Sequence, residues 1–193
     1  LVTFALAKAQ KASGVAALPT DKPYVRTAAI VLGTIGRADA IPAFLSTLKS
    51  TEDAETRAVL AHELSRLPAT PETKAAFQSA FQSLPTSTVI TQGRMAVLAL
   101  TEAAAAFRDA KMVPWLLKRG PELKGTDNEK RVLQVLALQT AMKLMEADQV
   151  ELVGQALSKF AADVEKSGNG MDKRALADTK AFHQACAEIL KTC

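Results

Sequence analysis

Apolar residues recur along the chain at intervals of three and four, which is the spacing of the buried face of an α-helix. Ala and Leu, both strong helix formers, supply most of these positions. No stretch alternates apolar and polar residues in the way that a half-buried strand does. The pattern therefore predicts an all-α chain, with helices over about residues 1–12, 23–36, 40–49, 54–67, 71–84, 88–107, 110–118, 128–145, 148–166 and 172–191.

Two of these helices begin with recognisable capping residues. Thr70 stands directly before Pro71, and a threonine cap followed by proline in the first helical position is a common helix start. Thr126 and Glu129 have the three-residue spacing of a capping box. Both sites predict a sharp helix start at the residue after the threonine.

Four arginines head four similar helices, which indicates an internal repeat. They are spaced by 31, 37 and 37 residues: Arg26, Arg57, Arg94 and Arg131. The segment 53–57 (DAETR) recurs as 127–131 (DNEKR), and the segment 41–45 (IPAFL) recurs as 113–117 (VPWLL). A period in this range is typical of helical repeat proteins, in which each repeat is a pair of helices.

The first repeat, residues 21–36, reads DKPYVRTAAIVLGTIG and resembles HEAT and HEAT-like repeats of the phycobilisome-lyase type. The resemblance covers about residues 21–160. It implies a right-handed α-solenoid of about four to five helix pairs, in which the heading arginines pair with acidic groups of the neighbouring repeat. The chain is then a single domain over 1–193, with an N-terminal helix and linker (1–20), the repeats (21–167) and a closing helix that caps the stack (171–193).

The same resemblance implies where a partner binds. The arginine-headed helices are expected to line the concave side, with the residues one, five and eight positions after each arginine projecting from it. These are Thr27, Val31, Thr34, Ala58, His62, Ser65, Met95, Ala99, Glu102, Val132, Leu136 and Gln139. Among them, the expected partner-binding residues are Thr27, Thr34, His62, Ser65, Met95, Glu102 and Gln139.

Trp115 is a further candidate for binding. It stands where the equivalent helix of the first repeat has Ala43, so the repeat does not need a large side chain there. The tryptophan either packs on a neighbouring repeat or is a partly exposed anchor for a partner, a role in which tryptophan is over-represented.

Motifs for catalysis, metals or cofactors are missing from the sequence. It has no C-x-x-C, H-x-x-x-H or H-E-x-x-H motif and no glycine-rich phosphate loop. His183 and Cys186 have helical i, i+3 spacing, but no orienting third group or oxyanion loop accompanies them. We therefore expect no enzyme, no catalytic or metal-binding residue and no cofactor.

The two cysteines, Cys186 and Cys193, are expected to be buried thiols on the apolar stripe of the last helix, with a disulfide as the alternative.

Charge favours a protein partner over nucleic acid. The net charge is only +4, and the basic group between Arg108 and Arg131 is interrupted by four acidic residues. A solvated face with local ion pairs is expected there. HEAT-like DNA glycosylases bind duplex DNA with a basic concave face, so nucleic-acid binding stays open as the less favoured alternative.

The sequence thus predicts a non-enzymatic scaffold or adaptor that binds another protein or peptide, either alone or within a larger complex. Two alternatives remain: a HEAT-like nucleic-acid-binding protein, DNA glycosylase or lyase-type enzyme, and a structural segment of a larger envelope or multi-subunit assembly.

No apolar run reaches the roughly 18–20 residues of a membrane helix. The chain starts at Leu1, so a removed signal peptide fits the sequence. The periplasm or the cell exterior therefore stays open beside the favoured cytoplasm.

Overall fold

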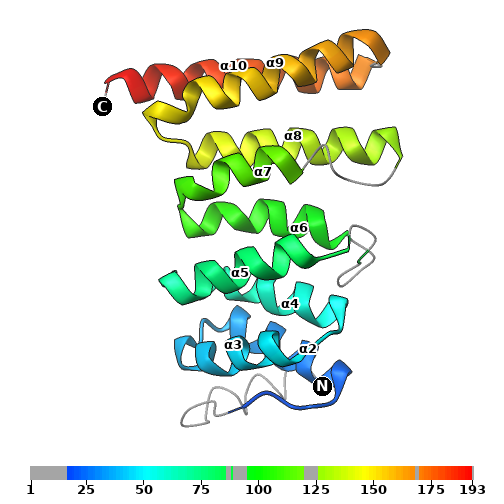
Figure 1. Cartoon of the computed structure of the whole chain (residues 1–193), viewed down its shortest axis with the longest axis vertical. Helices are drawn as coiled ribbons and strands as arrows, with labels where there is room; N and C mark the ends of the chain where they lie inside the picture. Colours follow the sequence, from blue (N-terminus) through cyan, green and yellow to red (C-terminus); the bar gives the residue numbers. More distant parts are fainter. Residues whose placement is uncertain (1–16, 86–87, 89–94, 120–125, 168–169, 193) are drawn as a thin grey trace. The chain divides into compact units, whose positions relative to one another are not determined.

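The computed structural model describes residues 17–85, 88, 95–119, 126–167 and 170–192 (Figure 1). In these ranges every regular element is a helix, so the predicted all-α class is confirmed. The described residues divide into two compact units, one ending at Phe107 and the other beginning at Arg108. The predicted N-terminal helix over 1–12 lies outside the described residues, and the single solenoid domain over 1–193 stays a prediction.

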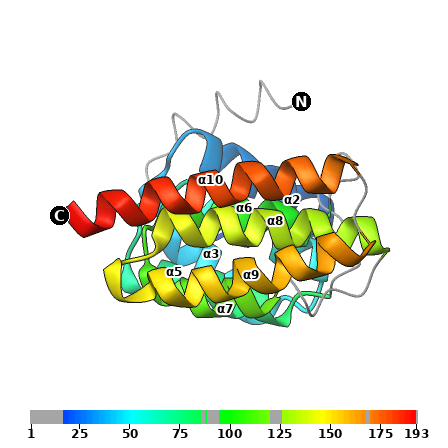
Figure 2. The ribbon, with the colours of Figure 1, turned by 90° about the horizontal axis from the view of Figure 1, so that it is seen from above.

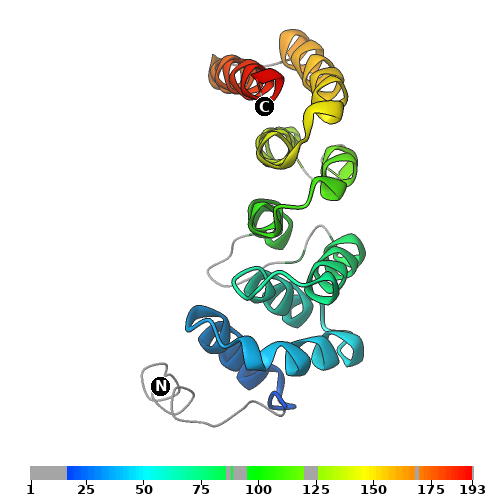
Figure 3. The same ribbon diagram turned by 90° about the vertical axis from the view of Figure 1, so that its left-hand side faces the viewer.

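The first unit consists of two layers of helices (Figure 3). Its helices are α2 (Lys22–Thr34), α3 (Ile41–Ser50), α4 (Ala54–Leu64), α5 (Pro71–Ser83) and α6 (Ala96–Ala103), with short 3-10 turns at Ala38–Ala40 and Ala104–Phe107. α4 packs between α2 and α6, and α3 packs on α5. Successive helices therefore alternate between an α2–α4–α6 layer and an α3–α5 layer, and α4 packs on α3 and α5 as well.

Apolar side chains from both layers fill the core of this unit. Phe44, Phe77, Phe81 and Leu64 have no exposed surface. The ring of Phe77 lies 6.0 Å from that of Phe81 and 4.7 Å from that of Phe107, both in tilted arrangements. Aromatic pairs favour such offset geometry. The core thus links α5 to the 3-10 turn that ends the unit.

The second unit repeats the alternation (Figure 2). Its helices are α7 (Val113–Arg119), α8 (Asp127–Leu144), α9 (Val150–Ser167) and α10 (Gly170–Thr192), with 3-10 turns at Ala110–Met112 and Ala147–Gln149. α8 packs on α10, and α7 packs on α9. α8 also packs on α7 and α9, which closes the core of the unit.

Both predicted caps are confirmed. The Thr70 side chain accepts the backbone N–H of Thr73, with Pro71 in the first turn of α5. At the start of α8, Thr126 accepts the N–H of Glu129, and the Glu129 carboxylate accepts the Thr126 N–H at 2.7 Å. The backbone N–H and the hydroxyl of Thr126 both donate to the Glu129 carboxylate and hold its pKa below the usual value.

The helix predicted over 88–107 is shorter than expected. Thr88 is not helical, its carbonyl accepts the N–H of Ala96 at 2.8 Å, and α6 begins at Ala96. The chain then tightens into the 3-10 turn at Ala104–Phe107. Residues 89–94, with Arg94, lie outside the described residues.

The last helix differs from its prediction at its C-terminal end. Phe182 and Ile189 share the helical spacing of the stripe that holds Cys186, yet they are 37% and 62% exposed. His183 Nε2 lies 3.3 Å from the carbonyl of Val150, the first residue of α9, so the following residues of α10 run past the start of α9. Cys186 is a free, half-buried thiol, while Cys193 lies outside the described residues.

Candidate functional site

The predicted binding residues of the first unit lie on one layer of helices. Thr27 and Thr34 belong to α2, His62 to α4, and Glu102 to α6, while Ser65 and Met95 flank α4 and α6. Thr27, Thr34 and Glu102 are exposed, and the other three are half-buried. We call this set of six residues, all on the α2–α4–α6 layer, the α2–α4–α6 face.

Three other residues of the same predicted row do not reach the surface. Val31, Ala58 and Ala99 are buried, so the expectation that they project from the concave side is wrong. Small and branched apolar side chains fill the space where neighbouring helices pack closely. The residues of this row that remain available to a partner are therefore mainly the polar ones.

The candidates of the second unit are partly exposed. Gln139 on α8 and Trp115 on α7 are half-buried, and Val132, from the same row as Gln139, is 42% exposed. Trp115 is thus neither fully buried nor fully exposed, which leaves both the packing and the anchor alternatives open.

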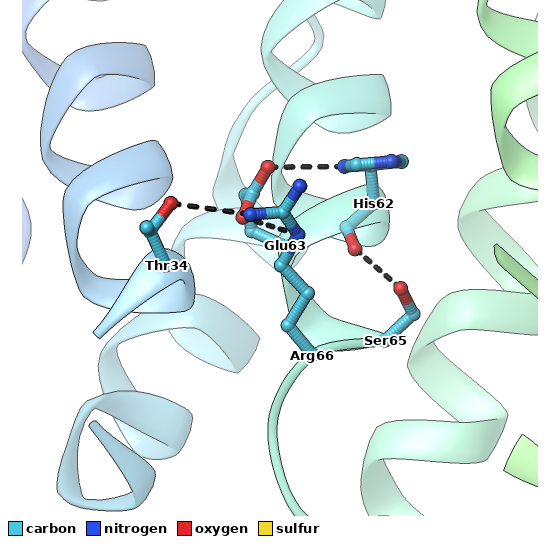
Figure 4. Close-up of polar contacts among 5 residues, drawn as sticks. All are labelled: Thr34, His62, Glu63, Ser65 and Arg66. Atoms are coloured by element: carbon cyan, nitrogen blue, oxygen red, sulfur yellow. Dashed lines mark hydrogen bonds and ion pairs between the residues drawn. The ribbon is translucent and has the colours of Figure 1, made fainter. Parts of the chain in front are cut away.

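Three of the predicted residues come together in a polar cluster at the C-terminal ends of α2 and α4 (Figure 4). Ser65 Oγ donates to the His62 carbonyl at 2.6 Å. Arg66, in the turn after α4, donates from Nη1 to Thr34 Oγ1 at 3.2 Å and so links this turn to α2. Glu63, which sequence analysis did not select, lies at the centre of this group. We call these five residues the Glu63 cluster.

The Glu63 carboxylate is buried, with 4% of the residue exposed. Its Oε1 lies 3.0 Å from His62 Nδ1, and its Oε2 lies 3.4 Å from Arg66 Nε, too long for a good hydrogen bond. A buried carboxylate is costly unless it is paired. His62, from the last turn of α4, and Arg66, from the turn that follows α4, provide that pairing.

Gly33 makes the room that the Glu63 side chain occupies. A Cβ atom on Gly33 would lie 2.4 Å from Glu63 Oε2 and 2.7 Å from Glu63 Cβ, closer than atoms approach. α2 then ends at once, because Gly36 takes a left-handed conformation (φ 69°) and Arg37 N–H donates to the Leu32 carbonyl at 3.0 Å. This helix end places Thr34 beside Arg66.

The carboxylate also fixes the orientation of the His62 ring. An ionised carboxylate only accepts hydrogen bonds, so its contact with Nδ1 favours the form of the ring with a proton on that nitrogen. In the neutral ring Nε2 is then an acceptor. The cluster therefore presents a held imidazole, a hydroxyl and a guanidinium at one surface.

A signal for Glu63 exists in the sequence. Val59, Leu60, Leu64 and Leu67 form an apolar stripe at helical spacing, and all four are buried. Glu63 is the charged residue within that stripe. A charge in such a position is rarely buried without a partner, so it marks a polar site inside the layer.

Two of the heading arginines form an ion pair with an acidic residue on the next helix of their layer, and the partner of Arg131 lies in the helix that was expected to close the stack. Arg26 on α2 forms an ion pair with Glu55 on α4. Arg131 on α8 forms one with Asp172 on α10 at 2.6 Å. In each pair the donor and acceptor lie on helices of the same layer.

The expectation is wrong for Arg57. Its Nη2 donates to the Ser83 hydroxyl at 2.8 Å rather than to an acid. The sequence gives the reason: the acids used elsewhere stand two residues before a later arginine, as in Glu55 before Arg57, and the corresponding residue before Arg94 is Gln92.

The residues considered for catalysis and metal binding are not arranged for either. Burial raises the pKa of the Cys186 thiol, the opposite of what a nucleophilic cysteine needs. His183 faces the Val150 carbonyl. Within the described ranges no three His, Cys, Asp or Glu side chains are grouped to hold a metal ion.

Comparison with models of known protein families, with curated protein sequences and with solved structures gives no match to the chain. None of the helices described is long and apolar enough to cross a membrane. The HEAT-like resemblance and the function that it implies therefore enter below as proposals.

Proposed function

We propose that the chain is a non-enzymatic scaffold or adaptor of the HEAT-like type, which binds another protein through the α2–α4–α6 face. The observation that carries the proposal is the Glu63 cluster. Thr34, His62 and Ser65 were selected from the repeat register and the HEAT-like resemblance, and they lie together in this cluster at one end of two neighbouring helices.

The alternation of helices within each unit supports the HEAT-like architecture. α2, α4 and α6 form one layer against α3 and α5, and α8 and α10 form one layer against α7 and α9. Stacked helix pairs produce such layers. The right-handed solenoid with a closing helix is an extension of this proposal to the whole chain.

The chemistry of the cluster suits recognition of a protein surface. His62 is held by Glu63, and Arg66 by Thr34 and Glu63, so these groups lose little conformational freedom when a partner binds. Exposed Thr27 and Glu102 extend the polar surface along the same layer. This mixture of donors and acceptors fits a protein partner better than a phosphate backbone.

Site-specific photocrosslinking in the native source tests the proposal. A benzoylphenylalanine at exposed Thr34 or Glu102 is expected to crosslink to the same protein, whether the salt concentration is low or high. The matched control is exposed Ser46 on α3, in the opposite layer, which is expected to give no such product. Equal crosslinking from Ser46 would contradict the face, and a nucleic-acid product lost at high salt would favour the alternative.

A further inference from the structure

Arg57 is a half-buried cation for which the described part of the chain provides no carboxylate. Its Nη2 donates to Ser83 Oγ, and its Nε is buried without a hydrogen-bond partner. Arg26 and Arg131, the equivalent residues, each have an acidic partner. The guanidinium charge thus has only a neutral hydroxyl as its hydrogen-bond acceptor, so this arginine can gain from an added anion.

The Arg57 side chain lines a groove of about 490 Å³ between α3 and α5. Leu45 and Leu48 of α3 and Ala76 and Ala80 of α5 form its apolar part. The small alanines on α5 leave the space that larger side chains would fill. The groove is within the size range of sites that take a few side chains of a ligand.

Charge is distributed unevenly along this groove. Lys49, exposed in the last turn of α3, adds a second positive charge to the lining. Glu72 is its acidic residue, but it lies in the first turn of α5, roughly 16 Å along the helix from Ser83, to which Arg57 is bonded. Hydrogen bonds from its own backbone and Thr70 hold Glu72 there and lower its pKa.

We propose that the groove binds a peptide segment of a partner protein in which an Asp or Glu side chain lies next to an aliphatic one. The carboxylate pairs with Arg57 near Lys49, and the aliphatic side chain packs on Leu45, Leu48 and the alanines of α5. Arginine suits this role because its planar guanidinium matches carboxylate geometry. The groove lies in the α3–α5 layer, so it is a second surface that does not depend on the α2–α4–α6 face.

Selection of a random-peptide phage library on the full chain tests this proposal. The enriched peptides are then measured by fluorescence anisotropy against the wild type and two variants. Ala75→Glu places a carboxylate at an exposed position in the groove lining, and Gln82→Glu places the same charge on the same helix at an exposed position outside it. We expect a loss of about tenfold or more in affinity for Ala75→Glu and less than about twofold for Gln82→Glu.

The Arg57→Gln variant is a second arm. It is expected to lose the peptides while its circular dichroism spectrum stays helical, and Ala75→Glu keeps the test valid if Arg57→Gln fails to fold. Three results overturn the proposal: no peptide is enriched, the enriched peptides have no acidic residue beside an aliphatic one, or the two α5 variants bind equally. Loss of crosslinking at Thr34 with retained peptide binding separates this site from the α2–α4–α6 face.

Discussion

The contacts of α2 with α4 and of α8 with α10 are two versions of the same junction between neighbouring helices. Each contains an ion pair that joins a heading arginine to an acid on the next helix of the layer, Arg26 to Glu55 and Arg131 to Asp172. The second pair is better shielded, since the Asp172 side chain is 11% exposed and that of Glu55 is 53% exposed.

The two helices that head these junctions differ seven residues after the arginine. α2 has Gly33 there and accommodates the Glu63 carboxylate, whereas α8 has Leu138, which is 3% exposed. An aliphatic residue at this position is the ordinary solution for a packed layer. The polar version in α2 and α4 is the less stable choice for a core and is therefore the better candidate for a binding site.

The largest expected effect on stability comes from truncating Leu138, the aliphatic residue of the α8–α10 junction. Leu138→Ala removes a buried side chain and leaves a cavity, so we expect the free energy of unfolding to fall by about 3 kcal/mol. Urea denaturation followed by circular dichroism measures the change. Leu152→Ala, at a 40% exposed position of the same unit, is the control and is expected to change stability little. A loss for Leu138→Ala no greater than that for the control would contradict its place in the core.

Filling the space in the polar version is the next largest effect. Gly33→Ala forces a Cβ atom against Glu63 Oε2 and Cβ, and α2 and α4 must shift apart. We expect a loss of about 2 kcal/mol in the free energy of unfolding, as for other overpacked cores.

A double-mutant cycle with Glu63→Ala identifies the cause of this loss. The alanine removes the clash with the carboxylate but keeps the Cβ atom that would lie 2.7 Å away, so it is expected to rescue Gly33→Ala only in part. Additive losses in the double variant would show that Gly33 is needed for another reason.

Helix positions in this chain follow from local physical chemistry and were therefore predictable. Apolar spacing located the helices of both units, and the caps at Thr70 and Thr126 depend on residues three positions apart. The late start of α6 at Ala96 was missed, although residues 88–95 contain four β-branched residues and a glycine, all weak helix formers. The exposure of Phe182 and Ile189 depends on where α9 begins, which is a tertiary property.

The candidate site was predictable only in part. Repeat register selected Thr34, His62 and Ser65, because equivalent positions of neighbouring helices face the same way. It missed Glu63 because that residue lies on the buried apolar stripe of α4. It missed Arg66 because that residue follows Ser65, the last position that the register selects on this helix. It also failed for Val31 and Ala99, where the interior of the layer, rather than the face of one helix, decides burial.

The smallest expected effect on stability, and the sharpest test of the comparison, is Glu63→Met, which makes the polar junction apolar. Replacing a buried charged group by an apolar side chain of similar size is often neutral or stabilising, so we expect the free energy of unfolding to change by no more than about 1 kcal/mol. His62 and Arg66 remain partly exposed, so neither is left as a buried, unpaired charge.

Crosslinking from Thr34 is nevertheless expected to fall in Glu63→Met, because His62 and Arg66 lose the carboxylate that orients them. Glu63→Gln keeps the shape without the charge and is expected to retain part of the crosslinking. A loss of several kcal/mol in Glu63→Met with normal crosslinking would instead make Glu63 a structural residue and remove the reason for placing the binding site at this junction.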